Sequence, residues 1–236
     1  MSSDDGFDSG RDDGEDDGDE LITLDDLSRT IPIFPLPGVL LLPGGMLPLN
    51  IFEPRYLAMT RDALDGAQLI GMIQPTETRS RDARPDVYRI GCVGSIVAAS
   101  ETDDGRILIT LRGLCRFAVA RELETETPYR QVDADYTPFA GDLDPVPSGS
   151  LHRDRLIQAL RGFCERHNLP ADWDSIDSAP DDLLVHSLGM ICPFSAGEKQ
   201  ALLEAPDFAA RAEMLVALLE MAQHDRPSTT THRRLN

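Results

Sequence analysis

The sequence contains a single lysine, Lys199, which lies four residues after Ser195. A serine/lysine hydrolase needs a desolvated lysine amine beside the nucleophilic hydroxyl, so this pair is the first candidate for chemistry. However, a serine followed three residues later by Glu198 is the pattern of a capping box at the start of a helix. We therefore predict that Ser195 caps a helix and that Lys199 is a solvated charge on that helix.

Other catalytic patterns are missing from the sequence. It has no Gly-x-Ser-x-Gly nucleophile elbow. The segment around the lysine also lacks the glycine-rich loop ending in Gly-Lys-Ser/Thr that cradles nucleotide phosphates. The residues therefore exclude ATP hydrolysis, and we assign no catalytic residue.

The histidines and cysteines show no spacing that suits a metal ion. Two of the cysteines, Cys92 and Cys115, fall in apolar, strand-like runs, where a buried free thiol is the usual state. We predict no metal site and no cofactor. The residues concerned are His152, His167, His186, His224, His232, Cys92, Cys115, Cys164 and Cys192.

One polar cluster, Glu53-Pro54-Arg55-Tyr56, interrupts a strongly apolar part of the chain. The favoured interpretation is a helix start whose Glu53 and Arg55 pair with backbone or with each other, because buried charges persist mainly when paired. The alternative makes Arg55 and Tyr56 contacts for a partner peptide.

The first half of the chain reads as short strands with one helix among them. Prolines and glycines alternate with strong apolar residues over 31–53, which indicates strands with fixed bends. Proline near a first helical turn and a following glycine predict the bounds of the helix. The predicted elements are strands over 31–36, 39–43 and 46–52, and a helix from Glu53-Pro54 to Asp65-Gly66.

Period-two alternation of apolar residues then recurs several times, which indicates an antiparallel sheet that is closed or nearly closed. Asp103-Asp104-Gly105 is a hairpin turn signal between two of these strands. The predicted strands are 68–74, 87–100, 106–113, 115–124 and 129–138.

A boundary rich in proline and glycine follows at 138–149, and the apolar period then changes from two to about 3.6. This change predicts a helical second part. Its helices cover about 150–167, the segment from Leu183 to Ile191, a helix that begins after Ser195, and one over 208–222 capped by Asp207.

The sequence carries 41 acidic and 22 basic residues, a net charge of −19. Residues 1–26 hold twelve acids and one arginine, a net −11, which leaves −8 for the rest of the chain. Such a chain is repelled by phosphate backbones and anionic lipid, so we predict no nucleic-acid or membrane partner. Without an apolar leader segment or a disulfide framework, we expect a reduced, soluble, cytoplasmic protein.

Several of these segments resemble a known family. FPLPGVLLLPGGMLPLNIFEPRYLAM (34–59) is similar to the hallmark of the Lon N-terminal, or Lon substrate-binding, domain. The later segments LIGMIQP (69–75), YRIGCVGSIV (88–97) and DGRILITLRGLCRF (104–117) are similar as well, and EKQALLE…R (198–211) resembles the end of that family's helical subdomain. The resemblance covers residues 31 to about 222.

The resemblance implies an α+β fold: an N-terminal PUA-like β-barrel with one inserted helix, followed by a C-terminal helical bundle. The expected organisation is an acidic disordered tail (1–26), a barrel subdomain (27–140), a helical subdomain (150–223) and a flexible tail (224–236). In full-length Lon protease such a domain precedes an ATPase and a Ser/Lys peptidase and helps to engage substrates. This sequence stops at 236, so we expect a stand-alone, non-enzymatic relative.

The leading functional hypothesis is a module that binds polypeptide segments in protein quality control or proteolysis. Its expected contacts are Leu40, Leu42 and Met46 in an exposed apolar loop, together with Arg55 and Tyr56. The first three could instead fill the core. Two alternatives stay open: an adaptor that docks on a separate protease, and a barrel that holds a small ligand. The oligomeric state is left open.

Overall fold

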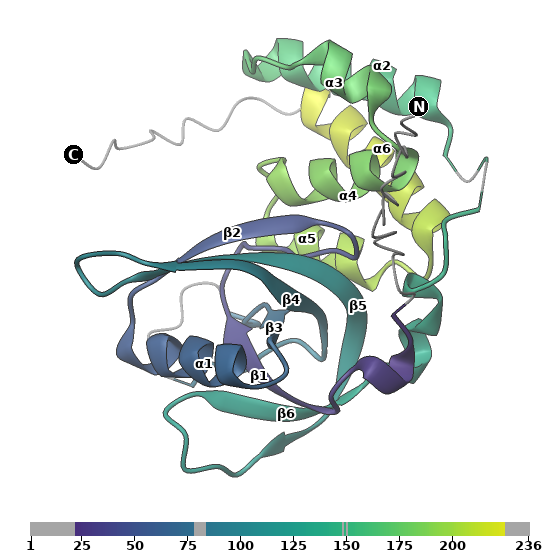
Figure 1. The fold of residues 1–236 in the computed structure, drawn as a ribbon. Helices are drawn as coiled ribbons and strands as arrows, with labels where there is room; N and C mark the ends of the chain where they lie inside the picture. The colour runs from purple at the N-terminus through teal and green to yellow at the C-terminus, as the bar shows by residue number, and fades with distance from the viewer. Residues whose placement is uncertain (1–21, 78–83, 148, 150, 225–236) are drawn as a thin grey trace, which may run out of the picture.

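The computed structural model describes residues 22–77, 84–147, 149 and 151–224, and it shows a six-stranded sheet followed by a set of helices (Figure 1). The predicted α+β class is therefore confirmed. Most of the two predicted tails, 1–21 and 225–236, lies outside the described residues. The strands are β1 (Thr30–Pro35), β2 (Met46–Ile51), β3 (Leu69–Ile73), β4 (Ile90–Glu101), β5 (Ile107–Leu123) and β6 (Arg130–Asp135). The helices are α1 (Pro54–Asp65), α2 (Arg153–His167), α3 (Trp173–Ser178), α4 (Asp181–Ile191), α5 (Ala196–Glu204) and α6 (Phe208–His224), with short 3-10 turns η1 (Leu24–Asp26) and η2 (Thr137–Asp142).

The strand pairings run in a closed ring. β5 pairs with β4, β4 with β3, β3 with β1, β1 with β6, and β6 again with β5. A sheet that closes on itself in this way is a barrel, and strands inside the ring have no free edge. The sixth strand, β2, pairs within the described part of the chain with the first part of β5 alone, from Met46 opposite Arg112 to Ile51 opposite Ile107.

Two details of the sheet differ from the sequence prediction. β1 and β3 run parallel, with Ile33 opposite Gly71, so the sheet is not purely antiparallel. A parallel pair needs a crossover, and β2 and α1 supply it here. The two strands predicted over 106–113 and 115–124 are one continuous strand, β5. Its first part pairs with β2 and its last part pairs with β6.

The segment 39–43 is not a strand, although its composition predicted one. The residues directly after it are held against β5, where Gly44 N–H donates to Gly113 O (2.8 Å) and Gly113 N–H donates to Gly45 O (2.9 Å). A Cβ on Gly113 would lie 2.1 Å from the carbonyl oxygen of Leu42. The backbone can approach this closely only because Gly113 has no side chain.

The helix bounds follow from local capping chemistry. Pro54 occupies the first turn of α1 and Gly66 follows its last residue, as predicted. Ser195 and Glu198 form the predicted capping box of α5, and the Asp207 carboxylate accepts from Ala210 N–H at 2.8 Å in the first turn of α6. The six-residue α3, capped by Asp172, was missed because it is too short to show a period.

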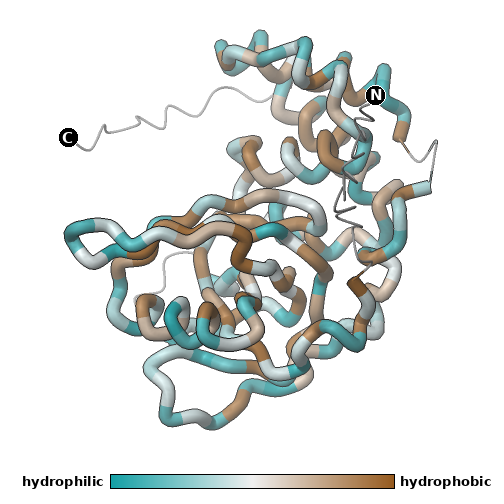
Figure 2. Tube along the Cα trace, in the orientation of Figure 1, coloured by the Kyte–Doolittle hydropathy of each residue, from teal (hydrophilic) through white to brown (hydrophobic). Residues whose placement is uncertain are grey.

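The helical part packs directly on the barrel. α6 contacts α2, α4 and α5, and α5 contacts β4 of the barrel. The larger of two apolar cores runs without interruption from α1 and β2 to Leu215 and Leu219 of α6. The smaller core, around Phe117, fills the barrel interior. In Figure 2 the brown, apolar stretches of the chain fall mainly within the strands and helices, while the loop between β4 and β5 is teal and hydrophilic.

Candidate functional site at the barrel mouth

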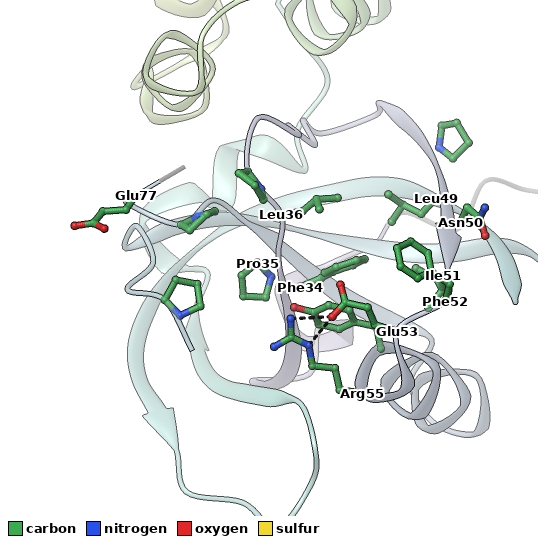
Figure 3. Close-up of a pocket in the computed structure, with 15 residues that line it drawn as sticks. Phe34, Pro35, Leu36, Leu49, Asn50, Ile51, Phe52, Glu53, Arg55 and Glu77 are labelled. Atoms are coloured by element: carbon green, nitrogen blue, oxygen red, sulfur yellow. Dashed lines mark hydrogen bonds and ion pairs between the residues drawn. The ribbon is translucent and has the colours of Figure 1, made fainter. Parts of the chain in front are cut away.

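A groove of about 430 Å³ opens at the mouth of the barrel, between the end of β1 and the strand β2 (Figure 3). Its apolar lining comes from Phe34 and Leu36 on one side and from Leu49 and Phe52 on the other. Prolines complete the walls, namely Pro35, Pro37, Pro48, Pro75 and Pro85. Proline and aromatic rings are rigid, so little side-chain entropy is lost when a ligand packs on them.

The first turn of α1 closes one end of the groove. Glu53 ends the extended segment and serves as the N-cap residue, so the helix begins directly beside β2. Arg55 donates from Nε to Glu53 Oε2 (3.0 Å), and its Nη2 lies 2.9 Å from the same oxygen. Both side chains are partly exposed, and the pair leaves this end of the groove with little net charge.

Tyr56 forms the floor at this end. Its ring lies 4.2 Å from the ring of Phe34, centroid to centroid, and the Arg55 guanidinium lies 4.5 Å above the Tyr56 ring. Burial raises the pKa of the Tyr56 phenol, so the hydroxyl stays protonated at neutral pH. The Tyr56 side chain therefore offers an apolar face rather than a charge.

The second edge of β2 borders the same groove. β2 stands at the end of the strand order, and within the described residues no backbone hydrogen bond joins its outer edge to another segment. An open strand edge carries unpaired N–H and C=O groups that a further strand can bind. Pro48 lacks one such donor, which limits unspecific pairing along this edge.

The five residues predicted as peptide contacts lie in three different environments. Arg55 and Tyr56 line the groove. Leu40 and Leu42 are 3% and 0% exposed and belong to the core, which was the alternative interpretation of this loop. Met46 is half exposed at the start of β2, outside the groove lining.

Sequence reasoning missed the groove's most exposed apolar side chain, Phe52, which is 63% exposed. The strand alternation carried a signal, because Phe52 directly follows Ile51, which is buried. In a strand, neighbouring side chains point to opposite faces, so Phe52 had to point outward. The predicted charge pair of Glu53 with Arg55 is present in the structure.

Lys199 lies outside the mouth groove and is buried, so the prediction of a solvated charge is wrong. Lys199 is 8% exposed, and its ammonium donates to Gly38 O (3.1 Å) and Met190 O (3.0 Å). Burial lowers its pKa. The Ser195 hydroxyl accepts from Glu198 N–H as a helix cap, so the two residues do not form a catalytic pair. Lys199 instead fastens α5 to the loop that follows β1.

A second buried charge holds the barrel against the helices. The Arg116 guanidinium binds both oxygens of Asp142, with Nε and Nη2 each at 2.8 Å. Its Nη1 donates to the carbonyl oxygens of Leu203, in the last turn of α5, and of Ala205 directly after that helix. The Arg116 and Asp142 side chains are only 3% and 7% exposed. Because both ends of this ion pair are satisfied, it is an architectural contact.

His186 and Arg211 form a further buried pair at the same junction. Arg211 donates from Nη1 to His186 Nε2 (3.0 Å) and from Nε to Leu202 O (3.0 Å). Since Nε2 accepts, the proton of the neutral ring sits on Nδ1, where it can bond the backbone of Pro43. Burial, together with the Arg211 charge, lowers the pKa of His186 to about 4.

The structure offers no metal site among the residues it describes, since no group of three histidine, cysteine or carboxylate side chains gathers there. All four cysteines are buried free thiols, as predicted for Cys92 and Cys115. Burial raises the pKa of Cys115 to about 12, so its sulfur is not a nucleophile at neutral pH. No helix within 22–77, 84–147 and 151–224 combines the length and apolar composition that crossing a bilayer requires.

Comparison with known proteins gives a consistent result over nearly all of the described chain. Residues 30–221 match the family model described as the ATP-dependent protease La (LON) substrate-binding domain. The Lon protease of Dictyoglomus thermophilum is 37% identical over 213 residues, and that of Anaeromyxobacter dehalogenans is 33% identical over 208. These matches cover 85% and 84% of this chain but only 25% and 24% of the relatives, so the chain spans about a quarter of their length.

Two solved structures share the fold. The N-terminal domain of the Mycobacterium avium complex Lon protease has a TM-score of 0.60 at 17% identity, over 83% of this chain and 98% of that one. A Lon N-terminal domain protein from Xanthomonas campestris has a TM-score of 0.55 at 24% identity, over 80% and 97%. At these identities the likeness establishes the fold alone.

Proposed function

Because this chain belongs to the family of Lon substrate-binding domains, we propose that it recognises polypeptide segments for proteolysis and cuts none itself. The observation that carries the proposal is the mouth groove, where an apolar and proline-rich lining lies beside an open strand edge. A polypeptide chain is the ligand that can use both features, since its backbone can pair with the edge while its side chains fill the groove.

The chemistry of the groove favours apolar, extended segments. The Glu53–Arg55 pair compensates its own charge and Tyr56 is neutral, so this end of the groove offers apolar surface rather than a charge sign; Glu77 is the further charged residue of the lining. Such segments are buried in folded proteins and become exposed when these unfold. Recognition of them suits a domain that delivers damaged chains to a protease.

The lining also supports a non-catalytic role. Among the described residues that line the groove there is no serine, threonine, cysteine, lysine or histidine. The titratable side chains among these residues are Glu53, Glu77, Arg55 and Tyr56. The Glu53 carboxylate already accepts a hydrogen bond from Arg55. Peptide hydrolysis needs an activated nucleophile or water, and this set provides no nucleophile with an adjacent base.

The proposal is tested by fluorescence anisotropy with labelled 12-residue peptides that differ in apolar content. We expect apolar peptides to bind and Phe52→Asp to weaken their binding about tenfold or more, or about 1.4 kcal/mol. Met221→Asp is the matched control, because Met221 is exposed to the same degree (62% against 63%) but lies on α6. A second arm uses peptides with N-methylated backbones, which cannot donate to the strand edge and should bind more weakly.

Two results would overturn the proposal. One is that none of the peptides binds the unaltered protein. The other is that Phe52→Asp and Met221→Asp have the same effect, because binding would then not depend on the groove.

A further inference from the structure

A second hollow, of about 500 Å³, lies between α2, α3 and α4 and is separate from the mouth groove. Its base consists of apolar side chains from two of these helices, including Leu160, Phe163, Leu184 and Leu188. Figure 1 shows α2 and α3 at the far end of the molecule from α1 and the barrel mouth. We call this hollow the helical groove.

Exposed apolar residues concentrate at its rim. The described residues include nine large apolar side chains that are exposed, and Leu169, Leu183 and Ile191 are three of these. All three line the helical groove, and Ile191 is 73% exposed. Single exposed apolar residues are ordinary, but several around one concave surface mark an interaction site.

The walls of the groove restrict the form of a partner. They are built mostly from helices, whose backbone groups are already hydrogen-bonded along their own axes. The groove therefore offers side chains but no strand edge, in contrast to the mouth. A partner that fits must satisfy its own backbone and present an apolar stripe, which is what an amphipathic helix does.

The charge beside the groove indicates the sign of that partner. The eleven residues 172–182, which form α3 and lead into α4, contain five aspartates and no basic residue. Of these five, Asp172 is the one in the groove lining, where it also caps α3. Asp181 pairs with Arg153 and Arg161 of α2 stacks on Trp173, so five aspartates against these two arginines leave a net −3 beside the groove. The acidic margin attracts a cationic partner and repels an anionic one.

The same charge argues against other occupants. A second copy of this chain carries the same acidic margin and a net charge of −19, so pairing groove to groove would bring like charges together. An anionic lipid surface or a nucleic acid is repelled for the same reason. Helix geometry and charge thus select one class of partner.

We propose that the helical groove docks an amphipathic, cationic α-helix of another protein. The helix would place apolar residues at positions i, i+3 or i+4, and i+7 against Leu183 and Ile191, with lysines or arginines beside the acidic margin. This interaction is independent of the mouth groove and leaves the mouth open.

The probe for this proposal is a labelled 18-residue peptide with leucines along one helical stripe and lysines on the rest of its surface. A matched peptide replaces every lysine with glutamate. We expect the lysine peptide to bind at least tenfold more tightly than the glutamate peptide at low ionic strength, and this preference should fall as salt is added.

Variants locate the binding. Ile191→Asp should weaken binding of the lysine peptide at least tenfold, whereas Met221→Asp and Phe52→Asp should leave it unchanged. The pair Asp174→Asn and Asp177→Asn should reduce the preference for lysine over glutamate without altering the apolar contact. Because Ile191 is exposed, thermal unfolding of Ile191→Asp should match that of the unaltered protein, which separates lost binding from lost folding.

The proposal fails if neither peptide binds, if both bind equally, or if Ile191→Asp has no effect. Sedimentation supplies the remaining distinction. A dimer that dissociates on Ile191→Asp would assign the groove to a second copy of the chain and would overturn the cationic helix.

Discussion

Two regions of the molecule differ in which side chains they bury. The junction between the barrel and the helices buries charged side chains, whereas the mouth of the barrel exposes an apolar one. At the junction the charged side chains of Arg116, Lys199 and Arg211 are nearly inaccessible, and each donates to backbone carbonyl oxygens; Arg116 also binds Asp142, and Arg211 also donates to His186. At the mouth the charges are partly exposed, while Phe52 extends into solvent. The usual arrangement of polar outside and apolar inside is thus reversed at both places.

The buried charges at the junction and the exposed apolar side chain at the mouth have different roles: the first stabilise the fold and the second is open to a ligand. A buried charge is tolerated mainly where fixed partners compensate it, so Arg116 and Lys199 fix the helices to one place on the barrel, while Arg211 joins α6 to α4 and α5. An exposed apolar side chain gains nothing in the isolated molecule and gains free energy when a ligand covers it. At these two places the buried charges therefore hold the junction, and the exposed apolar side chain is available for binding.

The strongest test of this division is Asp142→Ala at the junction. Removal of the carboxylate leaves the Arg116 guanidinium buried without its ionic partner, and we expect a loss of about 3–5 kcal/mol in unfolding free energy. Denaturant titration measures the loss, and peptide binding at the mouth should persist in the molecules that remain folded. Asp144→Ala, at an exposed position in the same segment, is the control and should change stability by less than about 0.5 kcal/mol. A loss below about 1 kcal/mol for Asp142→Ala would show that the buried pair does not hold the junction.

Lowering the pH should reduce the unfolding free energy by less than Asp142→Ala does. His186 has a pKa of about 4 in the folded protein against 6.5 for an ordinary histidine. Below pH 6.5 the unfolded chain takes up this proton while the folded chain does not, so stability is complete above pH 6.5 and falls as the pH drops to about 4. At about 1.4 kcal/mol per pH unit the loss is about 3 kcal/mol.

The pH effect is assigned by comparing slopes. His186→Gln should flatten the change in unfolding free energy between pH 6.5 and 4, whereas His152→Gln, at an exposed position, should keep it. An equal slope in the unaltered protein and in His186→Gln would exclude His186 as the source.

The smallest effect is expected at Lys199. Lys199→Met removes two hydrogen bonds to backbone carbonyls but keeps the apolar stem, so we expect a loss of about 1–2 kcal/mol. Arg155→Met removes an exposed charge with two carboxylate partners and should cost less than about 1 kcal/mol. If Lys199→Met weakens peptide binding at the mouth without altering stability, then the junction does not act on stability alone, and the division of roles between junction and mouth is wrong.

Local patterns in the sequence predicted most of the elements. The capping box at Ser195, the proline at the start of α1 and the aspartate before α6 each act within one helical turn, so their neighbours in sequence are also their neighbours in space. For the same reason the pairing of Glu53 with Arg55, which lines the mouth, could be predicted.

The errors concern residues whose environment is set by distant parts of the chain. Lys199 resembles a surface residue until the loop at Gly38 covers it, 161 residues away in sequence. Leu42 lies in a strand-like run, but its backbone is held beside Gly113 instead. The parallel pairing of β1 with β3 depends on a crossover that no short window of sequence contains. Burial and topology of this kind are properties of the assembled fold.

The pairing of β1 with β6 joins Thr30 to Asp133 and so spans about a hundred residues of sequence. During synthesis the first strand has to wait, with its apolar face uncovered, until the last strand of the barrel has left the ribosome. Closure of so long a loop is entropically costly and slow, and it cannot proceed strand by strand from the N-terminus. The barrel therefore passes through a stage of its own synthesis in which an apolar strand face is exposed and open to aggregation.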